Sequence, residues 1–174
     1  MNAQIPIILY DSATIKAKVH ELADKLISEH GLENSVFICV MNGAFIFFSD
    51  LVRFLPDTIV TDFCRVTSYG ATKVSGLLTT KYWFDTRLFN KNVYIIDDIL
   101  DSGSTLKFLA EKAEKCNAKS VHTISLLERK NSCKLPNHTS LFTIDDEWVY
   151  GYGMDLYGTK RSNPNIMYLD SNID

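Results

Sequence analysis

The sequence contains few cysteines, and those it has lie far apart. Only four occur among 174 residues: Cys39, Cys64, Cys116 and Cys133. No two of them have the spacing of a metal-binding pair, and four dispersed thiols do not make a disulfide framework. We therefore expect reduced thiols in a cytoplasmic protein, most of them core or incidental residues.

Long apolar runs and a surplus of basic charge are also missing. No apolar segment approaches the roughly 20 residues that cross a membrane. Residues 1–10 lack the basic start, apolar stretch and small-residue cleavage site of a secretion signal. The formal net charge is −3, so general binding to nucleic acid is not expected. An anionic small ligand would have to be bound by local groups, because the overall field does not attract it.

What is present is an alternation of helix and strand patterns over the length of one domain. Apolar residues at helical spacing predict helices over 15–26, 45–55 and 106–113. Short apolar runs predict strands over 36–41, 59–69, 93–96, 121–127, 141–144 and 166–169. The polar segment 70–88 predicts a loop or a loose hairpin. This order indicates an α/β fold in which helices flank a doubly wound, mostly parallel sheet, in a single domain over 1–174.

The clearest chemical pattern lies at 95–106. An apolar strand brings the chain to the carboxyl edge of the sheet, where open sheets bind ligands, and Asp97 and Asp98 follow there. The run from Ser102 to Thr105 then begins a helix. The free N–H groups and the dipole of a helix N-terminus bind phosphate, and the hydroxyl groups add donors. Gly103 lets the backbone approach a ligand closely.

Carboxylates beside a phosphate site indicate a ligand that combines sugar, phosphate and metal. Asp97 and Asp98 suit ribose hydroxyls or a magnesium ion that bridges to phosphate groups. Asp101 lies between the acid pair and the phosphate site, a suitable place for a proton-transferring group. An ordinary helix cap uses the same residue types, but it does not need three aspartates and four cap-type residues within nine positions. The glycine motifs of other phosphate-binding loops are absent from the sequence.

Two acids, two apolar residues and Asp-Ser-Gly-Ser-Thr resemble the signature of the type I phosphoribosyltransferases. From about residue 36 to 169 the chain is similar to the hypoxanthine-guanine branch of that family. The resemblance implies the type I phosphoribosyltransferase fold, with a small hood formed by N- and C-terminal segments. It implies a purine-salvage enzyme that transfers 5-phosphoribosyl from phosphoribosyl diphosphate to hypoxanthine or guanine, giving IMP or GMP and pyrophosphate. It also implies Mg²⁺ as cofactor and a homodimer or homotetramer.

The resemblance assigns roles to the residues of the motif. Asp101 becomes the general acid and base near N7 of the purine. Asp97 and Asp98 hold the ribose hydroxyls and a magnesium ion. The loop of Ser102, Gly103, Ser104 and Thr105 binds the 5′-phosphate.

Residues outside the motif receive roles in the same way. Asp155, which ends Gly-Tyr-Gly-Met-Asp, contributes to a second metal and to the purine site. Arg161 contacts pyrophosphate. Trp148 stacks on the purine, and the backbone of Val149 contacts the base. Ser68 and Tyr69 begin a mobile loop that closes over the reacting sugar.

The sequence departs from the family pattern at two places. Met41-Asn42-Gly43 stands where Leu-Lys-Gly is common, but Asn42 and Gly43 should still bind pyrophosphate, because the contact is made by backbone. The family lysine that donates to the purine 6-oxygen aligns with Arg129, which Lys130 follows. Adjacent strand residues point to opposite faces, so only one of the two should reach the base, and the alignment favours Arg129.

Alternatives remain for these outlying residues and for the function. Taken alone, Arg129 and Lys130 are typical of a solvated strand end, Trp148 and Tyr150 of a core, and Tyr69 of an exposed loop. The base could instead be xanthine, adenine or a pyrimidine. The protein could also be a regulator that senses phosphoribosyl diphosphate and binds nucleic acid, although the acidic balance and the complete catalytic set argue against this.

Overall fold

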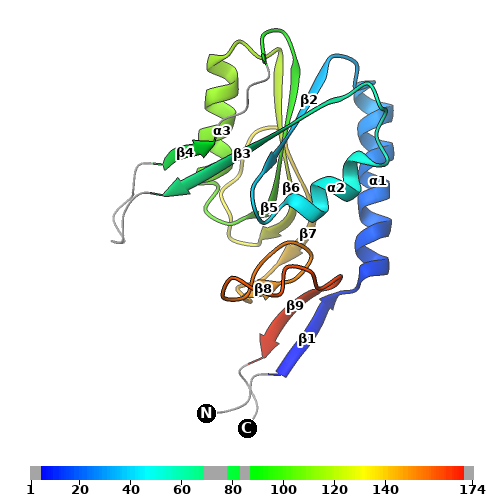
Figure 1. Cartoon of the computed structure of the whole chain (residues 1–174), viewed down its shortest axis with the longest axis vertical. Coiled ribbons are helices and arrows are strands. Elements are labelled where there is room, and N and C mark those ends of the chain that lie inside the picture. The colour runs from blue at the N-terminus through cyan, green and yellow to red at the C-terminus, as the bar shows by residue number, and fades with distance from the viewer. Residues whose placement is uncertain (1–4, 69–77, 83–86, 171–174) are drawn as a thin grey trace.

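A six-stranded sheet forms the centre of the computed structural model, which describes residues 5–68, 78–82 and 87–170 (Figure 1). The order across the sheet is β4-β3-β2-β5-β6-β7. The strands are β2 (Ser35–Val40), β3 (Val60–Ser68), β4 (Leu78–Tyr82), β5 (Asn92–Leu100), β6 (Ser120–Arg129) and β7 (His138–Ile144). All neighbours pair in parallel except β3 and β4, which are antiparallel. The predicted α/β fold with a mostly parallel sheet is therefore confirmed.

Helices cover both faces of this sheet, which explains the continuous apolar runs of its central strands. Alternate residues of β2 enter different cores: Phe37 and Cys39 pack under α1 (Ser12–His30) and α2 (Phe45–Val52). Val36 and Ile38 pack under α3 (Ser104–Lys115) on the opposite face. In Figure 1, α1 and α2 lie on one side of the sheet and α3 on the other. The helices on both faces thus cover apolar residues that the central strands direct to both sides of the sheet.

Helix boundaries follow ordinary capping chemistry. Asp11 caps α1, since its carboxylate accepts a hydrogen bond from the Thr14 N–H at 2.8 Å. Gly31 ends the helix with a left-handed φ of 63°, which a glycine adopts without steric cost. After β6 the alternation of strand and helix stops, because residues 130–137 cross to the parallel strand β7 without a helix.

A second, antiparallel sheet forms a hood at one end of the molecule. It contains β1 (Ile5–Tyr10), β9 (Ile166–Asp170) and β8 (Val149–Tyr150), in the order β1-β9-β8. Strands β1 and β9, from the first and last parts of the described chain, therefore lie side by side (Figure 1). The hood was expected from the family resemblance, whereas the apolar pattern alone missed both β1 and β8.

The polar segment 70–88 was expected to be a loop or a loose hairpin. Its described part contains β4, which pairs with β3 in a hairpin arrangement. Residues 69–77 and 83–86 lie outside the described residues. Within 5–68, 78–82 and 87–170, no helix is long and apolar enough to cross a membrane.

Candidate active site

A pocket of about 200 Å³ opens at the carboxyl ends of β5 and β6. Its lining consists of Asp98, Ile99, Asp101, Arg129, Trp148, Val149, Met154 and Asp155. Six of these eight residues were predicted as site residues from the sequence, all except Ile99 and Met154. The fold thus brings together side chains from the end of β5, the end of β6, β8 and the segment that follows β8.

Two larger cavities lie elsewhere on the molecule. One, of about 670 Å³, lies between α1, α2 and residues 152–164. The other, of about 550 Å³, lies between α3 and the 133–137 connection and reaches the phosphate loop at Ser102, Gly103 and Ser104. Neither contains the acid pair or Arg129. The chemistry of its lining, and not its size, therefore identifies the smaller pocket as the candidate active site.

The acid pair at the end of β5 is buried unevenly. Asp97 is only 7% exposed and does not line the pocket, whereas Asp98 does. Asp97 Oδ1 accepts a hydrogen bond from the Asp98 N–H at 3.0 Å, and Asp98 Oδ1 accepts one from the Ile99 N–H at 2.8 Å. Burial raises the pKa of Asp97 well above its usual value, and the charge of Asp98 raises it further. Burial also raises the pKa of Asp98, although hydrogen bonds with the Asp97 side chain and the Ile99 N–H, and the Arg161 charge, oppose that effect.

Arg129 is fixed on the wall of the pocket by three contacts. Its side chain is 17% exposed, and its Nε lies 3.4 Å from Asp101 Oδ1. Its Nη1 donates to the carbonyl oxygens of Asp145 at 2.8 Å and Glu147 at 3.3 Å. A planar guanidinium can make these contacts together because its donors are held in a rigid fork. Asp101 itself is 71% exposed and open to a ligand.

Lys130 does not line the pocket. Its Nζ pairs with Asp145 Oδ1 at 2.5 Å, and more than half of both side chains is exposed. The description of a solvated strand end therefore fits Lys130 and is wrong for Arg129. The structure agrees with the alignment in bringing Arg129, rather than its neighbour, to the pocket.

The expected phosphate loop begins α3 with an unusual backbone. Gly103 is the N-cap with φ of 76°, and a Cβ at this position would lie 2.1 Å from Cys133 Sγ. Glycine is therefore required both by the backbone and by the close packing of Cys133. Gly103 has no side-chain acceptor, and the Ser104 N–H, the first of the helix, donates instead to Ser102 Oγ at 3.4 Å. Ser102 and Ser104 are exposed beside it, with their hydroxyl oxygens 3.0 Å apart, and Thr105 is half-buried.

Two glycines bring two loops and the end of β5 into contact behind the pocket. A Cβ on Gly43 would lie 1.5 Å from Asp98 Oδ2, and one on Gly153 would lie 2.2 Å from the Gly43 carbonyl oxygen. The Met41–Asn42 peptide that precedes this contact is cis. The expected pyrophosphate loop at Asn42 and Gly43 thus touches both the acid pair and the segment that carries Asp155.

Asp155 and Arg161 are paired with each other. Arg161 Nη2 lies 2.6 Å from Asp155 Oδ1, and Arg161 Nη1 donates to the Gly153 carbonyl at 2.7 Å. The Gly158 N–H donates to the other Asp155 oxygen at 2.8 Å. Contact of Arg161 with pyrophosphate would therefore require the guanidinium to share or exchange this carboxylate partner.

The aromatic residues near the pocket differ in how far they are exposed. Trp148 is 70% exposed at the pocket, whereas the next two residues, Val149 and Tyr150, are buried in β8. The core interpretation is thus confirmed for Tyr150 and wrong for Trp148. A large exposed aromatic ring beside a small polar pocket is available to stack on a flat ligand. Ser68 ends β3, and Tyr69 lies outside the described residues.

Reasoning from the sequence missed several residues of this region. Ile99 and Met154 line the pocket, Cys133 packs on the phosphate loop, and Gly153 meets Gly43. The signal available for Gly153 was the Gly-x-Gly spacing before Asp155, since closely placed glycines mark a close backbone approach. Among the described residues, no three His, Cys, Asp or Glu side chains gather closely enough to hold a metal ion by themselves.

Comparison with known proteins agrees with this geometry. A family model of the phosphoribosyl transferase domain matches residues 8–156. The hypoxanthine-guanine phosphoribosyltransferase of Dictyostelium discoideum is 36% identical over 166 residues, 91% of this chain and 92% of that protein. The Bacillus subtilis protein of the same name is 33% identical over 169 residues, 95% of this chain and 94% of its own.

Solved structures show the same likeness. A hypoxanthine-guanine phosphoribosyltransferase from Bacillus anthracis superposes with a TM-score of 0.87 at 31% identity, covering 93% of this chain and 97% of that one. A hypoxanthine phosphoribosyltransferase from Trypanosoma cruzi, complexed with the product IMP, has a TM-score of 0.85 at 25% identity, covering 98% and 93%. This chain therefore belongs to the phosphoribosyltransferase family and resembles its hypoxanthine-guanine members over nearly its whole length.

Proposed function

We propose that this single-domain protein transfers the 5-phosphoribosyl group of phosphoribosyl diphosphate to hypoxanthine or guanine, forming IMP or GMP and pyrophosphate in purine salvage. The observation that carries the proposal is the pocket that unites Asp98, Asp101 and Arg129 at the ends of β5 and β6. The pocket combines a carboxylate that would bind ribose or a metal ion (Asp98), a carboxylate that would transfer a proton (Asp101) and a cation that would bind the base (Arg129). The phosphate loop adjoins it directly, because Ser102 follows Asp101.

Arg129 is the residue that we propose reads the base. Its Nε and Nη1 contact groups of the protein, while among the described residues no hydrogen bond uses its Nη2. A donor at this place pairs with the carbonyl oxygen at C6 of hypoxanthine or guanine and meets the amino group of adenine unfavourably. Trp148 would stack on the purine ring, and the backbone of Val149 would contact its edge.

The sugar and its phosphates would lie along the other side of the pocket. The N-terminus of α3, with Ser102, Gly103, Ser104 and Thr105, would bind the 5′-phosphate. The backbone of Asn42 and Gly43, with Arg161, would bind the pyrophosphate. Asp97 remains a prediction as a ribose or metal ligand, because its side chain is buried and outside the pocket lining.

Magnesium fits the donors that this pocket offers. Asp98 and Asp155 line the same small cavity, and carboxylate oxygens are ligands that Mg²⁺ prefers. Since the described residues form no closed metal cage, we propose that these carboxylates hold the ion together with substrate oxygens. When bound, magnesium would neutralise negative charge on the departing pyrophosphate.

The reaction is a displacement at the anomeric carbon of the ribose. N9 of the purine forms the new bond as pyrophosphate leaves, and positive charge develops on the sugar ring. Asp98 and Asp101 place negative charge beside that ring. Asp101, which is exposed to the ligand, would hold the proton at N7 of the purine. Ser68 and Tyr69 remain the predicted start of a loop that excludes water from the reaction.

The name of one relative supports xanthine as a further base for this enzyme. The hypoxanthine-guanine-xanthine phosphoribosyltransferase of Tritrichomonas foetus is 28% identical over 169 residues, 95% of this chain and 92% of that protein. Xanthine also carries a carbonyl oxygen at C6, so Arg129 would accept it by the same contact. Xanthine is therefore the alternative base to include in a substrate panel.

A homodimer or homotetramer is the assembly that we propose. Phe45 of α2 and Val60 and Phe63 of β3 are each about two-fifths exposed, and the rings of Phe48 and Phe63 meet between these two elements. They provide adjacent apolar surface that a second copy could cover. Sedimentation analysis would measure the mass, and a monomer at micromolar concentration would contradict the proposal.

The function is tested by measuring pyrophosphate release. The protein is mixed with phosphoribosyl diphosphate, magnesium and one base at a time: hypoxanthine, guanine, xanthine or adenine. Release with hypoxanthine and guanine, none with adenine, and none after chelation of magnesium are expected. The melting temperature of the free protein should barely change on chelation, because the ion is held with substrate. Release that is absent with every 6-oxopurine, or that persists after exhaustive chelation, would contradict the proposal.

A further inference from the structure

Tyr152 has a backbone conformation that a bulky residue rarely adopts. Its φ is 47°, and it lies between Gly151 and Gly153, whose φ values are 91° and 105°. Glycine takes such values easily, but a tyrosine does so only when its surroundings hold it there. The segment 151–155 leads directly to Asp155 on the wall of the active site. The contacts that hold Tyr152 therefore also determine how this segment enters the site.

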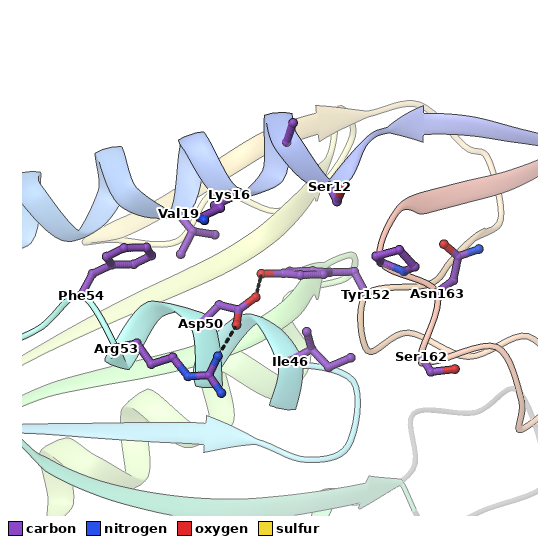
Figure 2. A pocket seen from close by; sticks show the side chains of 12 residues that line it. Ser12, Lys16, Val19, Ile46, Asp50, Arg53, Phe54, Tyr152, Ser162 and Asn163 are labelled. Carbon is purple, nitrogen blue, oxygen red and sulfur yellow. Dashed lines mark hydrogen bonds and ion pairs between the residues drawn. The ribbon is translucent and has the colours of Figure 1, made fainter.

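A side-chain hydrogen bond anchors Tyr152 outside the active-site pocket. Its hydroxyl group donates to Asp50 Oδ2 on α2 at 2.8 Å, across 102 residues of sequence. Figure 2 shows the ring reaching from its loop toward α2, beside the larger cavity between α1 and α2. Tyr152 is only 6% exposed, and its N–H donates to the Asn163 carbonyl at 2.7 Å. Burial, together with the Asp50 carboxylate, raises the pKa of Tyr152, so the hydroxyl stays a donor.

The two partners of this bond lie directly behind two parts of the active site. Gly153 follows Tyr152 and meets the Gly43 carbonyl so closely that a Cβ would lie 2.2 Å from it. Asp50 lies on α2, which begins at Phe45, two residues after Gly43. The bond between Tyr152 and Asp50 thus joins the helix that follows the 41–43 loop to the segment that packs on that loop.

The purine side of the pocket is held by other contacts. Val149 and Tyr150 pair with β9, and Arg129 Nη1 binds the carbonyls of Asp145 and Glu147. Val149, Tyr150 and Arg129 precede Gly151 in the chain, and none of these contacts involves Tyr152 or Asp50. Loss of the bond from Tyr152 to Asp50 should therefore leave the base side in place and loosen the contact between Gly153 and Gly43.

We propose that Asp50 and Tyr152 are a positioning pair that sets the pyrophosphate side of the active site against the segment carrying Asp155. Neither residue touches substrate. The proposal rests on the function proposed above, because it assigns pyrophosphate to the loop at Gly43. It goes beyond that function by making affinity for phosphoribosyl diphosphate depend on a hydrogen bond outside the pocket.

The test compares variants that remove the bond with one that keeps it. Tyr152→Phe removes the donor and keeps the buried ring, and Asp50→Leu removes the acceptor. Each should raise the KM for phosphoribosyl diphosphate and weaken calorimetric binding of magnesium pyrophosphate by on the order of tenfold, as for a lost hydrogen bond to a charged group. The KM for hypoxanthine should stay within about twofold. Asp50→Asn keeps an acceptor oxygen of the same shape and should restore near-normal values.

A double variant and a control variant test whether the effects come from this one hydrogen bond. The double variant Tyr152→Phe with Asp50→Leu should be no worse than either single change, because both remove the same bond. Amide hydrogen exchange over 151–155 should speed up in Tyr152→Phe, and this readout does not depend on activity. Tyr10→Phe is the matched control, since it also removes a hydroxyl hydrogen bond, to the Thr143 carbonyl at 3.2 Å, at a distant place in the hood.

Three results would overturn the positioning pair. They are a lower melting temperature with unchanged pyrophosphate affinity, an equal rise in the KM for both substrates, and equal effects of Asp50→Asn and Asp50→Leu. A wild-type protein that releases no pyrophosphate with any 6-oxopurine would instead refute the proposed function. Even then, pyrophosphate binding and hydrogen exchange in Tyr152→Phe would test the pair itself.

Discussion

The two sides of the active-site pocket are built in opposite ways. The part that we propose binds the sugar and its 5′-phosphate is one continuous stretch, 97–105, that runs from the end of β5 into the start of α3. The side that we propose binds the base is assembled from Arg129 on β6 and from Trp148 and Val149 at β8. The continuous side depends on backbone conformation and burial, whereas the assembled side depends on side chains that bind distant carbonyl groups. Substitutions on the two sides should therefore impair different properties: binding of phosphoribosyl diphosphate on the first side, and binding of the purine base on the second.

The largest effect is expected at Gly103 on the continuous side. Gly103→Val places a β-branched residue at φ of 76° and a side chain where Cys133 Sγ lies 2.1 Å from the Cβ position. The loop must shift, so binding of phosphoribosyl diphosphate and of the nucleotide product should be abolished. Calorimetry measures this.

Gly31→Val is the matched control for that experiment. Gly31 also has a positive φ, of 63°, but nothing lies within 4 Å of its Cβ position, and it ends α1. This variant should lose stability and keep nucleotide affinity. Unchanged nucleotide affinity in Gly103→Val would show that the phosphate binds elsewhere.

Asp101 joins the two sides, because it ends the acid stretch and contacts Arg129. Asp101→Asn keeps an oxygen for Arg129 but cannot take up a proton, so kcat should fall by about 10²-fold or more. The melting temperature should hardly change, since the side chain is largely exposed. Asp146→Asn, at an exposed acid outside the pocket lining, serves as control. A near-normal turnover in Asp101→Asn would remove this residue from the mechanism.

Substitution of Arg129 tests the proposed base-binding side of the pocket by itself. Arg129→Ala should raise the KM for hypoxanthine and guanine by roughly 10- to 100-fold, in the range of a lost charged hydrogen bond. The KM for phosphoribosyl diphosphate should change far less, because the groups that we propose bind its phosphates lie on the other side of the pocket. Lys130→Ala should do little, since Lys130 pairs with Asp145 away from the pocket. The reverse pattern would make Lys130 the reader of the base.

The smallest effect is expected in the stability of the free protein. Burial raises the pKa of Asp97 well above its ordinary value, so the folded state disfavours the charged form. The stability contribution of Asp97 is then fully present below about pH 4, the unfolded value, and is lost as pH rises through the raised folded pKa. Asp97→Asn should thus unfold at higher denaturant than wild type at pH 7, and the difference should vanish near pH 4. A variant less stable at pH 7 would contradict the burial argument.

Much of the fold could be predicted from apolar patterns. The central strands β2 and β5 carry apolar residues on both faces. A continuous apolar run of this kind predicts a buried strand without information from the rest of the chain. The hood strand β1 is mostly exposed or half-buried, and β8 is two residues long, so neither has a periodic signal. Their existence depends on pairing with β9 at the far end of the chain.

The residues of the site differ in the same way, because some have a local sequence signal and others do not. The acids and the phosphate loop were predicted from local chemistry, because ligand groups and loop lie within nine residues. Arg129, Trp148 and Asp155 were predicted only through the family resemblance, since nothing local distinguishes them from surface residues. Contacts such as Gly153 on Gly43, Cys133 on Gly103 and Tyr152 on Asp50 depend on packing between distant segments, which no pattern in one sequence reveals.

Competition between two bases tests the central claim, that the assembled side of the pocket selects a 6-oxopurine. Equimolar hypoxanthine and adenine compete for limiting phosphoribosyl diphosphate with magnesium, and the nucleotides formed are counted by chromatography. A buried donor matched to one base and opposed to the other discriminates by orders of magnitude, so IMP should exceed AMP by at least about 10³-fold. Comparable amounts of IMP and AMP would contradict the account.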